Sequence, residues 1–311
     1  MPRHLLNLFD LGQDGLLHVL DRADRLKQLR GRLDHPRPLA GKSIGLIMEK
    51  ASTRTRISFE VGIYELGGQP VALAGRDLQL GRDEPLTDTA KVLSRYLHGV
   101  VMRTGAHERI ETLARASEVP VINALTDKYH PCQLLADLMT IREHRPEGFK
   151  GLRVAWVGDG NNMAHSWILA SALCDFELSL ACPDRYQPLP EVLALADGQK
   201  RGRRVVTTDI DAAVRGAHVL TTDVWASMGQ EDEREERQKA FAGYCLSQRH
   251  LQKADEHAIF LHCLPAHRGE EVEAALIDGP QSLVWDEAEN RLHAQKALLE
   301  LLFSEPALKR A

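Results

Sequence analysis

Hydroxyl and guanidinium side chains gather in one short run of the sequence, formed by Ser52, Thr53, Arg54, Thr55 and Arg56. The apolar stretch 43–48 before it predicts a buried strand, and apolar residues at helical spacing after it predict a helix capped by Ser52 or Thr53. Arginines in the first turn of a helix oppose the helix dipole, which favours acidic side chains there. A bound anion removes this conflict, because backbone N–H groups, hydroxyls and guanidinium groups converge on it. The run therefore predicts a phosphate site.

Three more polar residues follow predicted strands of the same half of the chain. Arg103 ends the predicted strand 99–102, and His130 and Gln133 open a helix after the strand 120–124. Open α/β sheets bind ligands at the carboxyl ends of their strands. A histidine there can polarise a carbonyl group or hold an anion, and an amide offers both a donor and an acceptor. The alternatives are a surface ion pair for Arg103 and a helix cap without a ligand for His130.

Residues 157–163 form a strand-to-helix turn with the sequence Val-Gly-Asp-Gly-Asn-Asn-Met. The turn resembles a dinucleotide-binding fingerprint only weakly, because Met163 replaces the third glycine and would crowd the approach of helix to strand. Asn161 and Asn162 instead place amides at a helix N-terminus, which suits a small zwitterion or a carboxylate.

The segment 223–230 follows another predicted strand. Asp223 is suited to bind an ammonium group, and Ser227 and the backbone of Met228 are suited to a carboxylate. Because the apolar Met228 precedes Gly229, we expect a mobile loop that closes over a ligand.

The segment 261–269 allows three interpretations. A zinc site would use His262, Cys263 and His267, but the further Cys or His pair of common zinc spacings is missing. A nucleophilic Cys263 would need a base and an acyl substrate. A polar loop that lines a ligand needs nothing more, and we favour this interpretation.

Alternating strand and helix patterns predict the α/β class, with parallel-rich sheets covered by helices on both faces. The predicted strands are 43–48, 69–74, 99–102, 120–124, 152–157, 178–182, 205–207, 218–221 and 259–264. The main helices are expected at 15–32, from 52 or 53, and at 87–97, 110–117, 132–144 and 288–303. Pro146 and Gly148 mark the expected domain boundary. The charge-rich segment 231–237 is interpreted as a solvated helix face.

Length and composition indicate a two-domain globular protein of 311 residues. The formal net charge of −5 gives no electrostatic footprint for nucleic acid, and no apolar run is long enough to predict a membrane span. The N-terminus lacks the apolar core of a signal peptide. Five irregularly spaced cysteines indicate reduced thiols, so we expect a cytoplasmic protein.

The chain resembles the transcarbamylases in three runs that match their carbamoyl phosphate signatures, namely Ser-Thr-Arg-Thr-Arg at 52–56, Met-Arg-Thr at 102–104 and His-Pro-Cys-Gln at 130–133. Two later runs narrow the resemblance to the ornithine carbamoyltransferases, namely Asp-Val-Trp-Ala-Ser-Met-Gly-Gln-Glu at 223–231 and His-Cys-Leu-Pro-Ala-His-Arg-Gly at 262–269. The match continues in order to Ala-Glu-Asn-Arg at 288–291 and covers most of the chain.

The resemblance implies a carbamoyl phosphate domain at 1–146, a Rossmann-like ornithine domain at 147–287, and a helix at 288–311 that returns to the first domain. It implies carbamoyl phosphate contacts from Ser52, Thr53, Arg54, Thr55, Gln79, Arg103, His130, Gln133, Cys263, Leu264 and Arg291. It implies ornithine contacts from Asn162, Asp223, Ser227 and Met228. It also implies a homotrimer in which Gln79 reaches the neighbouring subunit's phosphate site, and Arg82 is a second candidate for such a contact.

The implied reaction transfers the carbamoyl group to the δ-amine of ornithine and releases citrulline and phosphate, without a metal or an organic cofactor. Arg103, His130 and Cys263 are the implied catalytic residues. Arg56 has no implied role beyond a ligand contact or an ion pair with an acid such as Glu49. The implied direction is arginine biosynthesis, with catabolic citrulline phosphorolysis as the alternative. A nicotinamide-dependent dehydrogenase and a non-catalytic metabolite-binding protein are the competing functional hypotheses.

Overall fold

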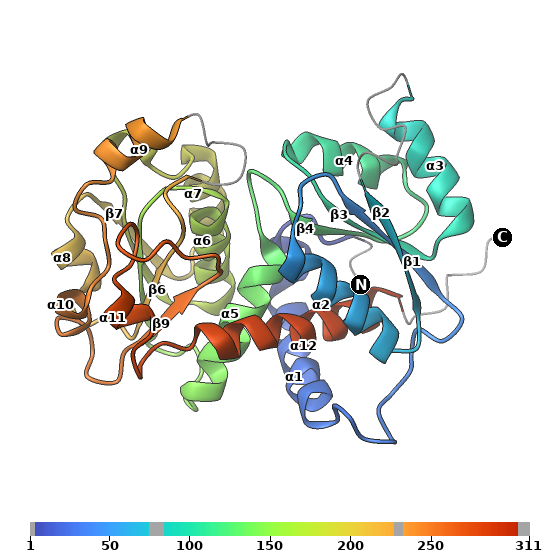
Figure 1. Ribbon diagram of the computed structural model, residues 1–311, viewed down its shortest axis with the longest axis horizontal. Helices are drawn as coiled ribbons and strands as arrows, with labels where there is room; N and C mark the ends of the chain where they lie inside the picture. Colours follow the sequence, from blue (N-terminus) through green and yellow to red (C-terminus); the bar gives the residue numbers. More distant parts are fainter. Residues whose placement is uncertain (1–3, 75–83, 227–232, 304–311) are drawn as a thin grey trace. The chain divides into compact units, whose positions relative to one another are not determined.

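The protein consists of two compact α/β units in a computed structural model that describes residues 4–74, 84–226 and 233–303. The first unit comprises Met1–Met139 and Glu289–Ala311, and the second comprises Thr140–Ala288 (Figure 1). The boundary expected after residue 146 therefore lies a few residues beyond the division in the structure. Among the described residues, no helix combines the length and apolar character needed to cross a membrane.

The first unit is built on a four-stranded parallel sheet whose strand order is β2-β1-β3-β4. Its strands are β1 (Ser43–Met48), β2 (Gln69–Ala74), β3 (Gly99–Arg103) and β4 (Val121–Leu125). The direction of strand order reverses between β1 and β3, and doubly wound sheets bind ligands at the carboxyl ends of such neighbouring strands. The predicted phosphate run follows β1, and Arg103 is the last residue of β3. Both therefore lie at this switch point.

Helices cover both faces of the first sheet. In Figure 1, α3 (Leu86–Tyr96) and α4 (His107–Ala116) lie over one face, while α1 (Gly12–Gln28) and α2 (Thr53–Glu65) lie over the other. The short helix η1 (Leu8–Asp10) precedes α1. Two helices, α5 (Pro131–His144) and α12 (Val284–Phe303), each contain one of the two points where the chain passes between the units.

Buried polar contacts attach α12 to the helices of the first unit. Lys296 is fully buried and its Nζ lies 2.6 Å from a carboxylate oxygen of Glu65 in α2. Gly62 permits this close approach, since a Cβ at that position would lie 3.2 Å from Lys296 Cγ. Lys27 of α1 donates to the Asn290 side chain at 2.8 Å. These contacts set the position of α12, and with it the position of Arg291.

The second unit contains a five-stranded parallel sheet in the order β7-β6-β5-β8-β9. Its strands are β5 (Arg153–Val157), β6 (Glu177–Ala181), β7 (Arg203–Thr207), β8 (Val219–Thr222) and β9 (Ile259–His262). Counted from β5, this is the 3-2-1-4-5 order of the Rossmann fold, which agrees with the Rossmann-like domain that the resemblance implied. The switch point lies between β5 and β8, whose carboxyl ends lead to the loop after Val157 and to Asp223.

The helices of the second unit also pack on both faces of its sheet. On one side lie α6 (Asn162–Cys174) and α7 (Pro190–Asp197). On the other lie α8 (Ile210–Val214), α10 (Gln248–Leu251) and α11 (Ala274–Ile277), whose apolar residues share a core with Val157, Leu220 and Phe260. Two further segments, η3 (Asp184–Tyr186) and α9 (Arg234–Ala240), lie in connections after β6 and β8.

Candidate functional site

The phosphate run begins α2 as the sequence predicted. Ser52 is the N-cap with an extended backbone, and its Oγ accepts the Thr55 N–H at 3.3 Å. The first turn of α2 contains no acidic residue, and Thr53 and Arg54 are exposed there. Arg54 forms no ion pair with any described residue. This helix end therefore offers N–H groups, hydroxyls and an available guanidinium to an anion.

Two buried arginines converge on the Thr55 hydroxyl in the first unit. Arg103 Nη1 and Arg291 Nη2 each lie 3.3 Å from Thr55 Oγ1, and both side chains are almost fully buried. Arg291 Nη1 also donates to Gln133 Oε1 at 2.8 Å, and the Gln133 amide donates to Asp137 at 2.9 Å. Two guanidiniums that converge beside the N-terminus of α2 place several N–H donors together, which suits a bound anion.

His130 is buried beside these arginines. Burial first, and then the positive charges of Arg291 and Arg103, hold its pKa well below the usual histidine value. The imidazole is therefore neutral at neutral pH and carries one N–H donor, which suits a group that polarises a carbonyl without adding a charge. The neighbouring Cys132 is not a reactive thiolate, because burial raises its pKa to about 12.

A second polar cluster surrounds Asp223 in the second unit. Its Oδ2 accepts the Asn161 amide at 3.0 Å, and its Oδ1 accepts the Cys263 thiol at 3.2 Å. Asn161 also caps α6, since its Oδ1 accepts the N–H groups of Met163 and Ala164. Asn162 is the first residue of α6 and is buried. The cluster thus presents a carboxylate, a thiol and a helix N-terminus, which together suit an amino acid.

The loop after β9 turns earlier than the sequence predicted. The strand ends at His262 rather than Leu264, because His262 Nδ1 accepts the Leu264 N–H at 2.9 Å and Leu264 takes a φ of +56°. Non-glycine residues in this left-handed region are uncommon and gather at functional sites. Cys263 and Leu264 are both half-buried in this loop.

The contacts of the His262 ring nitrogens test the two other interpretations of this loop, a nucleophilic Cys263 and a zinc site. Because Nδ1 accepts from Leu264 and Nε2 lies 3.3 Å from buried Glu271, both nitrogens hold the loop in shape. Cys263 donates instead to Asp223, so the thiol–base pair of a His262–Cys263 nucleophile is not formed. The predicted zinc set of His262, Cys263 and His267 is not brought together, since His267 groups with Glu270 and Glu271 while His262 and Cys263 group with Asp223.

The interpretation of residues 231–237 as a solvated helix face was wrong for Arg237. This arginine is 6% exposed, and its Nη1 donates to Asp159 at 2.7 Å and to the Trp225 carbonyl at 2.9 Å. Its guanidinium also lies 5.0 Å from the ring centre of Tyr186. Burial raises the pKa of Asp159 to about 6, although the ion pair with Arg237 acts in the opposite direction. Arg237 therefore joins the end of β5 to the segment after β8.

The turn after β5 does not offer the open backbone that a dinucleotide needs. The Gly160 N–H donates to the Tyr186 carbonyl at 2.8 Å, and a Cβ on Gly160 would lie 2.3 Å from the Pro188 nitrogen. In a dinucleotide fold, the second glycine lets the backbone approach the pyrophosphate. Here the chain itself occupies that approach, so the glycine serves internal packing.

Arg56 pairs with Glu60 rather than with Glu49. The Arg56 Nε lies 2.8 Å from a Glu60 oxygen at i,i+4 spacing, and its side chain is 58% exposed. Glu49 instead accepts from Arg109 at 2.7 Å. Four candidate ligand-contact residues from the sequence lie outside the described part of the chain, namely Gln79, Arg82, Ser227 and Met228.

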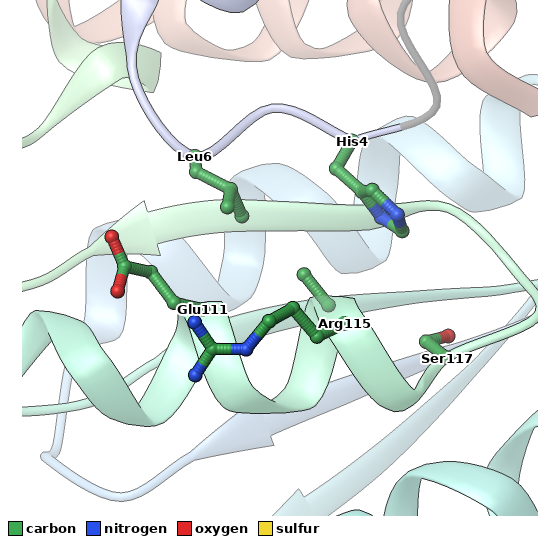
Figure 2. Close-up of a pocket in the computed structure, with 6 residues that line it drawn as sticks. His4, Leu6, Glu111, Arg115 and Ser117 are labelled. Atoms are coloured by element: carbon green, nitrogen blue, oxygen red, sulfur yellow. The ribbon is translucent and has the colours of Figure 1, made fainter.

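The first unit also has a surface hollow of about 420 Å³, lined by His4, Leu6, Glu111, Ala114, Arg115 and Ser117. Figure 2 shows Glu111 and Arg115 projecting from α4, opposite Leu6 and His4 of the N-terminal segment. None of the residues predicted from the sequence to bind a ligand lines it. The chemistry predicted from the sequence therefore resides in the buried clusters and at the start of α2.

Comparison with known proteins identifies a family domain in each half of the chain. The aspartate/ornithine carbamoyltransferase carbamoyl-P binding domain matches residues 3–143, and the Asp/Orn binding domain of that family matches residues 150–302. The protein belongs to the aspartate/ornithine carbamoyltransferase family. It is thus an enzyme, a carbamoyltransferase, with one domain of the type that binds carbamoyl phosphate and one of the type that binds aspartate or ornithine.

Relatives of this carbamoyltransferase match it over almost their whole length. It is 53% identical over 301 residues to the ornithine carbamoyltransferase of Halorhodospira halophila, covering 96% of this chain and 98% of that protein. It is 52% identical over 310 residues to ornithine carbamoyltransferase 1, anabolic, of Pseudomonas savastanoi, covering 99% of each. Ornithine carbamoyltransferase from Pyrococcus furiosus superposes with a TM-score of 0.92 at 44% identity, covering 98% of each chain.

One residue of the first cluster, Asp137, was missed in the sequence. Asp137 holds the Gln133 amide, and the two are four residues apart on α5, a spacing that places side chains on one helix face. That spacing could have identified Asp137. Of the two amides that the sequence placed at the start of α6, Asn161 contacts Asp223.

Proposed function

We propose that this protein is an ornithine carbamoyltransferase that transfers the carbamoyl group of carbamoyl phosphate to the δ-amine of L-ornithine. The observation that carries the proposal is the convergence of Arg103 and Arg291 on Thr55, in the first turn of a helix without acidic residues. This arrangement suits a dianionic phosphate with a polarisable carbonyl beside it. The ornithine carbamoyltransferase names of the relatives support the same conclusion.

In this proposal, Ser52, Thr53, Arg54 and Thr55 hold the phosphate through N–H groups, hydroxyls and the guanidinium. Arg103 and neutral His130 then donate to the carbonyl oxygen, where negative charge develops as the tetrahedral intermediate forms. Donors preset at that position stabilise the intermediate, and one such donor is typically worth about 2.7–4 kcal/mol of barrier.

Gln133 orients the carbamoyl nitrogen, and Arg291 links this amide to the Thr55 hydroxyl. Asp137 fixes the opposite end of the Gln133 amide, so the orientation of the amide is set before ligand binds. Preset orientation of this kind reduces the entropic part of the barrier.

Asp223 favours ornithine over aspartate as the acceptor. Its carboxylate is 7% exposed and is fixed by Asn161 and Cys263, so it attracts an ammonium group and repels a second carboxylate. Aspartate carries two carboxylates, whereas ornithine carries one carboxylate and two amines. We assign Asn162, Ser227 and Met228 to the same amino acid on the sequence resemblance.

The δ-amine must lose its proton before it attacks, since a free alkylamine has a pKa near 10.4. Removal from water lowers this pKa, and we assign the orientation of the nitrogen lone pair to Cys263 and the Leu264 carbonyl. The nitrogen then bonds to the carbamoyl carbon, the bond from that carbon to the phosphate oxygen breaks, and phosphate leaves with the electron pair and takes up the proton that the nitrogen releases. The reaction requires neither a covalent enzyme intermediate nor a metal or organic cofactor.

We also propose a biosynthetic direction, a cytoplasmic location and a homotrimer that shares Gln79 between subunits. The anabolic name of the Pseudomonas savastanoi relative supports the direction, and five free cysteines support a reducing compartment. The trimer rests on the sequence resemblance around residues 78–82.

Citrulline formation from carbamoyl phosphate and ornithine tests the proposed function. We expect turnover that requires both substrates, and no change in NADH fluorescence when the protein is titrated into NADH. NADH binding without citrulline would favour the dehydrogenase hypothesis, which the packing around Gly160 already disfavours. Ligand binding with neither activity would favour a non-catalytic binding protein.

Replacing Cys263 with alanine is expected to reduce turnover and to weaken ornithine binding by about tenfold, because the Asp223 carboxylate loses one hydrogen-bond donor. The affinity for carbamoyl phosphate should change less. Steady-state kinetics with each substrate varied measures both effects. Mass spectrometry of the wild-type enzyme quenched during turnover should show no carbamoylated Cys263, and a stable adduct there would contradict the direct-attack mechanism.

A further inference from the structure

Glu49 makes three contacts at the sheet edge where the phosphate run begins, and the proposed mechanism gives it no role. Its backbone N–H donates to the Arg103 carbonyl at 3.0 Å. One carboxylate oxygen accepts from Arg109 at 2.7 Å, and the other accepts the Thr104 hydroxyl. A single residue after β1 is thereby bound to the end of β3 and to the first turn of α4.

The end of β3 needs such support because its pairing with β4 is irregular. Met102 pairs with Asn123, but Arg103 pairs with Leu125, so one residue of β4 is skipped. A bulge of this kind redirects side chains and interrupts the ladder locally. Beyond it, the Thr104 N–H donates to the Leu125 carbonyl at 3.1 Å, which restrains this loop from the β4 side. Glu49 restrains it from the β1 side.

The charge of Glu49 shows that attraction for phosphate does not explain its presence. A carboxylate three residues before Ser52 acts against a dianionic ligand. Arg109 offsets that charge through the ion pair. Thr104 is fully buried, so its hydroxyl needs an acceptor, and Glu49 supplies it. The contacts of Glu49 therefore fit a geometric role.

From these contacts we propose that Glu49 is a positioning residue for Arg103. By holding Thr104 and the Arg103 backbone, it keeps the Arg103 guanidinium against Thr55 and in line with the carbonyl of the bound substrate. This inference rests on the proposed function, since it assigns Glu49 to the carbamoyl phosphate half of the same reaction. If a substitution away from the reacting atoms displaces a catalytic group such as the Arg103 guanidinium by about 1 Å, the rate can fall roughly a hundredfold.

Kinetics of Glu49→Ala, with each substrate varied in turn, test this role. We expect kcat/KM for carbamoyl phosphate to fall by about tenfold to a hundredfold, while KM for ornithine stays close to the wild-type value. Glu49→Gln keeps the side-chain size and one accepting oxygen, so it should retain intermediate activity; it also serves as the test if Glu49→Ala does not fold. Equal changes in both KM values would indicate general loss of structure and would overturn the proposal.

Glu118→Gln is a matched control, because Glu118 also pairs with an arginine of the first unit, Arg95, at 3.5 Å, but on the exposed surface. Its kinetics should equal those of the wild type. Thr104→Val and the double variant complete a thermodynamic cycle. If Glu49 acts through Thr104, the double variant should be little worse than Glu49→Ala, whereas additive losses would overturn the coupling.

Calorimetric titration with inorganic phosphate separates this inference from the proposed function. If the wild type forms no citrulline, the proposed function fails, and the ratio of phosphate affinities of wild type and Glu49→Ala still reports whether Glu49 shapes the anion site. If the wild type forms citrulline and Glu49→Ala matches it in kcat/KM, only the positioning role is overturned.

Discussion

Replacing Arg54 with alanine is expected to reduce carbamoyl transfer at least a hundredfold, since hydrogen bonds to charged groups contribute about 1.5–3 kcal/mol each and this guanidinium can form two of them. Arg54 is exposed in the first turn of α2 and forms no ion pair with a described residue, so a bound phosphate would be its partner. Initial rates across a range of carbamoyl phosphate concentrations, together with calorimetric binding of inorganic phosphate, measure the loss.

Arg56→Ala provides the matched control two residues away. This side chain is also exposed in the first turn of α2, but it is paired with Glu60, so its loss should change the rate only slightly. Wild-type kinetics in Arg54→Ala, or an equal loss in both variants, would contradict the phosphate site at Ser52–Thr55.

Replacing Arg237 with methionine is expected to destabilise the protein by about 3–5 kcal/mol, because it leaves Asp159 buried without its counter-charge. The loss should depend on pH. Burial raises the pKa of Asp159 in the folded protein above its unfolded value, so the folded state binds more protons and stability falls as pH rises through this range. Without the positive charge of Arg237, the pKa of Asp159 rises further, so the pH range over which stability falls extends to higher pH. The deficit relative to the wild type should therefore grow above about pH 6.

Urea unfolding at pH 5 and pH 8 measures this dependence. Arg234→Met is the control, since Arg234 belongs to the same helix but its ion pair with Glu270 is on the surface, where such pairs contribute about 0–1 kcal/mol. Combining Arg237→Met with Asp159→Asn should recover part of the stability at pH 8, as the second change removes the buried charge. Equal destabilisation by the two arginine variants would contradict the buried pair.

The sequence predicted those features that depend on local pattern and on the topology of α/β sheets. The Ser52 cap follows from a hydroxyl residue placed before an apolar helix. Once strands and helices alternate, the carboxyl ends of parallel strands share an edge, so Arg103 and the phosphate run were expected together. The structure shows Arg103 bonded to Thr55 at that edge.

Contacts between distant residues could not be predicted in this way. Asp159 and Arg237 are 78 residues apart, and nothing in a charge-rich helix distinguishes the one arginine that becomes buried. The pairing of Arg56 with Glu60 is different, because its i,i+4 spacing is visible in the sequence and could have identified Glu60 in place of Glu49. The sequence suggests Glu49 only as a partner for Arg56, because its contacts to Thr104 and Arg109 also join residues that are far apart in the chain.

Competition between acceptors tests whether this carbamoyltransferase uses ornithine as its acceptor. Equal concentrations of ornithine, aspartate and putrescine are incubated with carbamoyl phosphate and a limiting amount of enzyme, and the carbamoylated products are quantified by mass spectrometry. The repulsion expected between Asp223 and a second carboxylate predicts citrulline as the dominant product, with little carbamoyl aspartate. Carbamoyl aspartate or carbamoyl putrescine in excess of citrulline would contradict ornithine as the acceptor.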